Sequence, residues 1–167
     1  MQKYKIGDYV MYSVSGACEV IEIGTLDFAG PDKIYYSLRS VYDPKDVLYV
    51  AVANEDRIAR KVVDKETAQL MLAEIGHGRR EGEMPQREDC DAILKKADSK
   101  AITNMIRWLR HIRLENRKNN KHMNNADTKL LDNAERVMVS ELAAALEIPR
   151  EEAAEKLNMA LASGQAG

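Results

Sequence analysis

Residues 34–52, IYYSLRSVYDPKDVLYVAV, decide the fold of the first third of the chain. They form two runs rich in Val, Leu, Ile and Tyr, which favour strands, separated by Asp43 and Pro44, which favour a turn. The second run alternates with a period of two, as in a strand with one buried face. One face carries Leu48, Val50 and Val52, and the other carries Tyr49 and Ala51.

Outward from this hairpin, the N-terminal part continues as short strands. Strands are predicted at 8–12, 17–23, 34–40 and 47–52, with breaks at Gly16, Gly24, Gly30-Pro31-Asp32 and Asp43-Pro44. All seven tyrosines and the single Phe lie at or before Tyr49, so composition changes after this point. Four or five short strands in about 60 residues favour a small, strongly bent antiparallel barrel.

After Arg60 the pattern becomes helical. Asp64 is a candidate N-cap for a helix that ends near Gly76 and Gly78, and residues 77–86 are loop-like. Further helices are predicted from Asp89 or Cys90 to Lys96, from a Ser99 cap to about Lys121, from Asp127 to about Leu146, and from Pro149 to before Ser163. The predicted fold class is α+β, with a barrel over residues 1–62 followed by an all-α domain over residues 63–167.

Composition indicates a globular protein. Of the 167 residues, 45% are hydrophobic and 31% are charged, which excludes a disordered or collagen-like chain. The sequence has no run of about 18 apolar residues and its N-terminus is too polar for a signal peptide, so we expect a cytoplasmic protein without a membrane partner. Cys18 and Cys90 are expected to be reduced and buried as small apolar residues.

Charge is concentrated in one segment. Residues 95–121 carry nine basic and two acidic side chains, so they have a net charge of +7 while the rest of the chain carries −9. On an ideal helix the basic side chains gather in a sector of about 100° away from the apolar face. This sector contains Lys100, Arg107, Arg110, Arg117, Lys118 and Lys121. Such a row suits successive phosphates, although a solvated helix face that binds nothing explains the charge pattern about equally well.

No catalytic motif is present. The sequence contains no G-x-S-x-G, P-loop or G-x-G-x-x-G, and its three histidines are not spaced as metal ligands. We therefore expect no enzymatic activity, cofactor, metal or small-molecule substrate. Trp108 lies at the edge of the apolar face, where packing against the next helix is the expected role rather than insertion into DNA.

The order of these features resembles the CarD family of bacterial transcription regulators. The similarity is carried by residues 6–12 (IGDYVMY), 15–20 (SGACEV) and the closing helix segment 130–143 (LLDNAERVMVSELA). It covers nearly the whole chain. It implies a Tudor-like N-terminal barrel that docks on the β subunit of bacterial RNA polymerase, and a helical domain that contacts promoter DNA and stabilises the open complex.

The resemblance, together with the charge pattern, assigns residues to both partners. The polymerase is expected to meet the edge of the sheet at Tyr36, Ser37, Arg39, Tyr49, Val50, Ala51 and Val52. The DNA-binding set is Arg79, Arg80, Arg87, Lys95, Lys96, Lys100, Arg107, Arg110, Arg117, Lys118, Lys121 and Lys129. A tryptophan that many members carry corresponds to a position between Arg79 and Met84, where this sequence has no aromatic residue.

Two other functions fit the residues. One is a protein-interaction adaptor, in which the barrel binds a polymerase or repair partner and the helical half binds a second protein. The other is a barrel that binds RNA by itself, which ranks last because its basic residues are scattered among acids. Salt dependence distinguishes the adaptor from a DNA-binding regulator, since phosphate contacts weaken with salt and an apolar protein interface barely responds.

Overall fold

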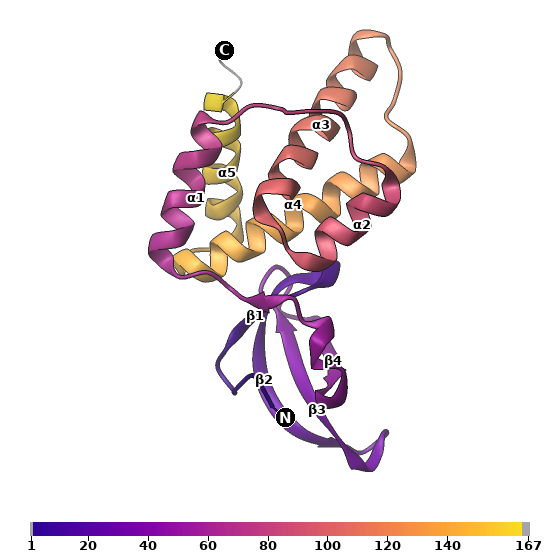
Figure 1. Cartoon of the computed structure of the whole chain (residues 1–167), viewed down its shortest axis with the longest axis vertical. Helices are drawn as coiled ribbons and strands as arrows, with labels where there is room; N and C mark the ends of the chain where they lie inside the picture. The colour runs from indigo at the N-terminus through magenta and orange to yellow at the C-terminus, as the bar shows by residue number, and fades with distance from the viewer. Residues whose placement is uncertain (1, 165–167) are drawn as a thin grey trace.

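A computed structural model describes residues 2–164 of the chain as a curved sheet joined to a group of helices (Figure 1). The strands are β1 (Tyr9–Tyr12), β2 (Gly16–Leu26), β3 (Gly30–Ser40), β4 (Val47–Ala51) and β5 (Arg60–Lys61). Every pairing is antiparallel and the strand order is β4-β3-β2-β1-β5. Two short 3-10 helices, η1 (Ser13–Ser15) and η2 (Val52–Arg57), connect strands. The mixed α+β class is therefore confirmed.

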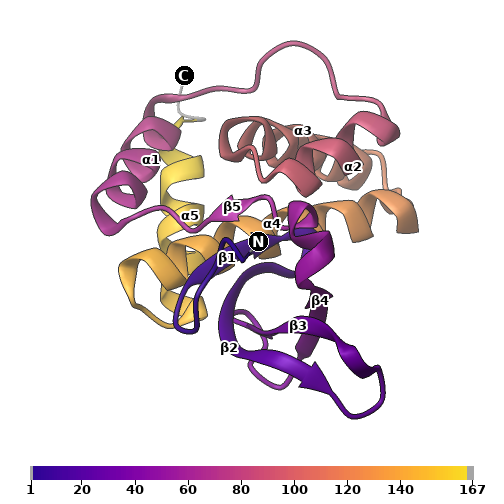
Figure 2. The same ribbon diagram turned by 60° about the horizontal axis from the view of Figure 1, so that its bottom comes forward.

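The sheet is open rather than closed. Within residues 2–164, the end strands β4 and β5 do not pair with each other, so the closed barrel expected from the sequence is not seen. The long strands β2 and β3 nevertheless curve strongly (Figure 2). Their register shifts between Val20 and Glu22 and again between Gly24 and Leu26, and such irregularities bend a strand. Gly24, predicted as a break, thus lies inside β2.

Within the described residues, five helices follow the sheet, as predicted. They are α1 (Lys65–His77), α2 (Arg87–Lys96), α3 (Ser99–Lys118), α4 (Asn125–Leu146) and α5 (Arg150–Gly164). The long helix α4 lies between the sheet and α3, while α1 and α5 pack side by side (Figure 1). None of the helices among the described residues is both long and apolar enough to cross a membrane.

Side-chain caps set where the helices begin. The Asp64 carboxylate accepts a hydrogen bond from Thr67 N at 2.7 Å, which confirms it as the cap of α1. The cap of α3 is Asp98, which accepts from Ala101 N, and not the predicted Ser99. The cap of α4 is Asn124, three residues before the predicted start. In these three helices a side-chain oxygen accepts from the amide three residues ahead, whereas α2 begins after Gln86 without such a bond.

The larger of two apolar clusters contains side chains from both the sheet and the helices. A small cluster fills the sheet, and a larger cluster between the helices takes in Met11 and Ala17 from the sheet. Cys18 and Cys90 are free and buried, as predicted, and burial raises the pKa of Cys18 to about 12. Because buried side chains cross between the two parts, the sheet and the helices support each other.

Candidate nucleic-acid interface and docking edge

The strand β4 presents a free edge. It pairs with β3 on one side and with no other strand among residues 2–164. Ser40 N donates to Asp46 O at 3.0 Å, next to the ladder in which Arg39 faces Val47. Hydrogen-bonded and non-hydrogen-bonded pairs alternate in an antiparallel ladder. The backbone amides of Val47, Tyr49 and Ala51 therefore point away from β3, on the side where another strand can add to the sheet.

The structure corrects part of the predicted docking set. β3 lies inside the sheet between β2 and β4, so the expectation that residues 36–39 form an edge is wrong. The side chains of Tyr36, Ser37 and Val50 are also at most 4% exposed. Only four members of the predicted set are at least partly exposed: Arg39, Tyr49, Ala51 and Val52. Sequence alone predicts two neighbouring strands, but it does not say which of them ends the sheet.

Tyr36 has a structural role instead. Its hydroxyl donates to Glu55 Oε2 at 2.5 Å, and the same oxygen accepts a hydrogen bond from Lys3 N at 3.0 Å. These two donors hold the pKa of Glu55 below its usual value. The buried tyrosine and this carboxylate thereby fix the N-terminal segment and η2 against the sheet.

An exposed aromatic pair lies beside the free edge. Phe28, in the turn between β2 and β3, is 76% exposed, and its ring centroid lies 5.6 Å from that of Tyr49 in an edge-to-face arrangement. Sequence analysis did not select Phe28. One feature of the sequence could have identified it. Phe28 is the only Phe of the chain and lies in a predicted turn, where an aromatic side chain has no core to fill.

A basic groove lies along α3. It is lined by six arginines, one histidine and no carboxylate, and one of its walls is the connection between α1 and α2. The lining residues are Arg79, Arg80, Arg107, Arg110, His111, Arg113, Leu114, Arg117 and Gly164. Among residues 2–164, Arg79, Arg113 and Arg117 take part in no ion pair. We call this surface the basic groove, and its unpaired cations can bind a polyanion.

Hydrogen bonds to the backbone N–H and C=O of one residue, Glu81, position the arginine-bearing connection. Asn104 of α3 accepts from Glu81 N at 2.8 Å and donates to Glu81 O at 3.1 Å. The Trp108 indole donates to the same carbonyl at 2.9 Å. These bonds fasten the connection across α3 (Figure 1). They place Arg79 and Arg80 beside the arginines of the helix.

Trp108 makes contacts that the sequence did not predict. The guanidinium of Arg80 lies 4.6 Å from the centre of its ring, and the His111 ring lies 6.1 Å away. The polar and cation–π contacts of Trp108 are thus made with the connection before α2, and not with the next helix as expected. The structure supplies an indole from α3 beside residues 79–84, where the resemblance implies a tryptophan.

Two predicted DNA-binding arginines are engaged inside the protein. The helical wheel placed Arg107 on an exposed face, but it is only 6% exposed and its Nη2 donates to Ile75 O at 2.7 Å. Desolvation by burial lowers its pKa. Arg110 pairs with Glu135 on α4 and donates to Asn158 Oδ1 on α5 at 2.7 Å. Both arginines therefore hold helices together at the floor of the groove.

The other predicted DNA-binding residues are exposed, but the groove gathers only some of them. Arg79, Arg80 and Arg117 line it, while Lys121 lies in a neighbouring hollow that also contains Arg113 and Arg117. Lys100 lines a small cavity under the connection, and Lys118 lies 3.4 Å from Glu115. The remaining four lie outside the groove, with Arg87, Lys95 and Lys96 on α2 and Lys129 on α4.

Arg113 is the groove residue that sequence reasoning missed. An ideal wheel places it within the apolar arc of α3, which the sequence analysis treated as buried along its whole length. In the structure, the buried residues of α3 end at Leu109, and the later turns project beyond α4 (Figure 1). The C-terminal half of the helix therefore exposes residues that the wheel assigns to the core side.

Comparisons with known families agree with this arrangement. Residues 4–63 match the CarD-like/TRCF RID domain, and residues 89–158 match the C-terminal domain of CarD. The chain belongs to the CarD family. Its N-terminal match implies interaction with RNA polymerase, and the family is one of RNA polymerase-interacting transcription factors. No curated protein matches the chain significantly.

Proposed function

We propose that the chain docks on the β subunit of bacterial RNA polymerase through the free edge of β4. We further propose that it lays the basic groove on promoter DNA and so prolongs the life of the open complex. It would act in the bacterial cytoplasm without catalysing a reaction. The observation that carries the DNA half is a groove with six arginines and no carboxylate.

The docking half is supported by the unpaired backbone of β4. A strand of the partner can add to this edge through main-chain hydrogen bonds, which tolerate changes in side chains. The aromatic pair of Phe28 and Tyr49 adds an exposed apolar contact next to it. Docking of this kind does not require a charged side chain at Ala51, in the middle of the edge residues 49–52.

The DNA half is supported by geometry as well as by charge. The cations come from two segments, the α1–α2 connection and α3, that Glu81 fastens together. A cation held in place loses less entropy when it binds a phosphate than one on a free chain. The internal pairing of Arg107 and Arg110 leaves Arg79, Arg80, Arg113 and Arg117 as the residues available to phosphates.

The groove is tested with duplex promoter DNA and the double variant Arg113→Gln/Arg117→Gln. Trp108 is the only tryptophan of the sequence, so its fluorescence reports DNA binding beside the groove. Loss of two phosphate contacts should weaken binding. It should also lower the slope of log Kd plotted against log salt concentration by about two. Lys65→Gln, at the opposite end of α1, is the control and should bind as the parent does.

The protein-adaptor alternative gives a different result. If the helical part binds a second protein, the parent shows no salt-dependent fluorescence change with DNA, and the double variant still acts on transcription. Equal DNA affinity of the parent and the double variant would also contradict the assignment of the groove.

A further inference from the structure

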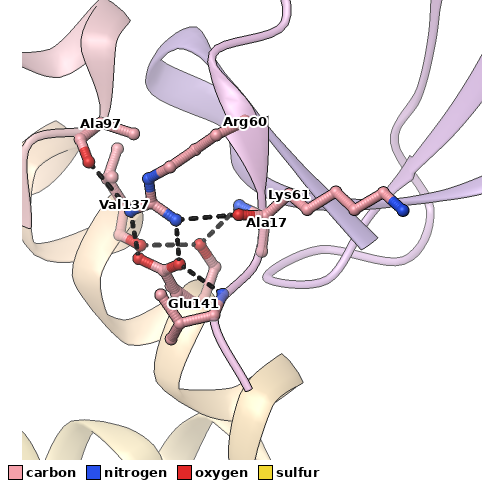
Figure 3. A network of polar contacts seen from close by, with 8 residues as sticks. Ala17, Arg60, Lys61, Ala97, Val137 and Glu141 are labelled. Carbon is pink, nitrogen blue, oxygen red and sulfur yellow. Dashed lines mark hydrogen bonds and ion pairs between the residues drawn. The ribbon is translucent and has the colours of Figure 1, made fainter. Parts of the chain in front are cut away.

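An ion pair with a buried carboxylate joins the last strand of the sheet to α4. Arg60 Nη1 and Nη2 lie 2.5 and 2.8 Å from the two carboxylate oxygens of Glu141, and Nη2 also donates to Ala97 O at 2.9 Å (Figure 3). Glu141 additionally accepts from Val63 N at 3.1 Å, and its side chain is 1% exposed. One carboxylate thus holds β5, the chain leading into α1, and α4.

A second contact lies one residue earlier on α4. Ser140 Oγ accepts a hydrogen bond from Ala17 N at 2.9 Å and donates to Val137 O at 3.0 Å. Gly16 allows this approach, because a Cβ there would lie 2.3 Å from Ser140 Oγ. The start of β2 therefore rests directly on the helix (Figure 3).

A third contact holds the loop between β3 and β4. The Tyr42 ring lies 5.3 Å from the guanidinium of Arg136 on α4 and 4.6 Å from that of Arg150 on α5. Arg150 Nη1 also donates to Tyr42 O at 2.6 Å. Together, the contacts at Arg60, Ala17 and Tyr42 attach the sheet at three separate points, which opposes rotation of the sheet on the helices.

We propose that Glu141 is a positioning residue that keeps the β4 edge and the basic groove at one fixed orientation. The inference rests on the proposed function, since it concerns how polymerase and DNA are engaged together. A bidentate Arg–carboxylate pair fixes direction as well as distance. A chain with both surfaces already oriented loses less freedom when the second partner binds, so its effective concentration at DNA is higher.

The buried carboxylate of Glu141 is costly for stability alone. Its side chain is 1% exposed while that of Arg60 is 31% exposed, so it is mainly the carboxylate that loses its hydration, and its hydrogen bonds must offset that loss. The arrangement around Glu141 uses several directional donors, at Arg60 and at Val63, beside the apolar cluster between the helices. This is the pattern expected of a contact that specifies orientation.

The test compares Glu141→Gln with the parent. Spin labels on Lys33→Cys in β3 and Met159→Cys in α5 report the distance between the sheet and the helices, while the buried Cys18 and Cys90 stay unlabelled. We expect one narrow distance distribution in the parent and a broader one in the variant. The matched control is Glu135→Gln, which breaks an Arg–Glu pair on the same helix but within the helical part.

Binding measurements supply a second test, because a residue that only stabilised the fold would not change the affinity ratio defined here. We define the gain as the affinity for a polymerase–promoter complex divided by the affinity for polymerase alone. The affinities of Glu141→Gln for polymerase alone and for DNA alone should stay within about twofold of the parent's. Its gain should be about tenfold smaller than that of the parent. Glu135→Gln should keep the gain, once corrected for its own DNA affinity.

Each outcome is decisive. A broad distribution in the parent overturns the proposal, as does Glu141→Gln with a narrow distribution or an undiminished gain. If the parent binds neither polymerase nor DNA, the proposed function fails while the spin-label distances still decide whether the orientation is fixed. If Glu141→Gln does not fold, Tyr42→Leu removes the third contact, leaves the Glu141 pair intact, and faces the same criteria.

Discussion

At the scale of single residues, close approaches between the sheet and α4 depend on small side chains. Gly16 has a positive φ of 72° and packs against Ser140 and the Val137 backbone. Its place in the sequence, before the predicted strand 17–23, indicated a break but not a contact with a helix more than a hundred residues away. The contact of Gly16 with α4 depends on packing between segments that are distant in the sequence. The periodicity of apolar residues does not predict such packing.

Replacing Gly16 with Ala should destabilise the protein. A backbone at this positive φ costs about 1–3 kcal/mol for a residue with a Cβ, and overpacking typically costs about 1–3 kcal/mol more. We therefore expect a loss of about 2–6 kcal/mol in the free energy of unfolding, measured by urea denaturation. Gly24→Ala is the control, since a Cβ there meets nothing within 4 Å. Equal stability of Gly16→Ala and the parent would show that the sheet does not rest on α4 as described.

Glu55 should make the stability of the sheet depend on acidic pH. Its folded pKa lies below the ordinary value of 4.5 because Tyr36 and the Lys3 amide donate to the carboxylate. The contribution is therefore complete above about pH 4.5 and is lost as the pH falls through the lower, folded pKa.

The stability difference between the parent and Glu55→Gln should accordingly be largest at neutral pH and shrink toward pH 3. Thermal unfolding followed at several pH values measures it. A difference that stays constant over this range would contradict the hydrogen-bonded carboxylate. Glu66→Gln, in the exposed first turn of α1, serves as a control with no such partner network.

At the scale of elements, the sequence predicted the strands of the hairpin and all five helices, because each has a clear period or cap. The order of strands in the sheet was not predictable, since 34–40 and 47–52 carry similar residues and either can end a sheet. The basic helix was recognised by its charge. The wheel nevertheless misplaced Arg107 and Arg113, because burial changes along α3 and a wheel averages over the whole helix.

The free edge of β4 gives a test at this scale. Tyr49→Pro removes an amide that points away from β3, so it should leave the β3–β4 ladder intact and reduce binding to the isolated polymerase β lobe at least about tenfold. Val50 is unsuitable for this test because it is buried. Tyr49→Ala is the control, since it removes the ring but keeps the amide.

Binding of the two Tyr49 variants separates main-chain from side-chain docking. Isothermal titration with the purified lobe measures it, and near-parental secondary structure by circular dichroism shows that the sheet is intact. Parental affinity of Tyr49→Pro would contradict strand addition at β4, whereas a loss in both variants would assign the contact to the aromatic pair of Phe28 and Tyr49.

At the scale of the whole molecule, the β4 edge belongs to the sheet and the basic groove to the helices, which lie at opposite ends of the long axis (Figure 1). The net charge of −2 conceals this division, because the basic groove is offset by acids elsewhere. A mildly acidic protein can therefore reach DNA when its polymerase contact holds the groove nearby. The two surfaces are useful together only if one molecule presents both.

The most direct test of this account is the lifetime of the open complex formed by RNA polymerase from the same bacterium on one of its promoters. We expect the parent to lengthen the lifetime severalfold, and both Tyr49→Pro and Arg113→Gln/Arg117→Gln to remove most of this effect, with Lys65→Gln behaving as the parent. A parent that leaves the lifetime unchanged, or variants as effective as the parent, would contradict the proposed action on polymerase and DNA.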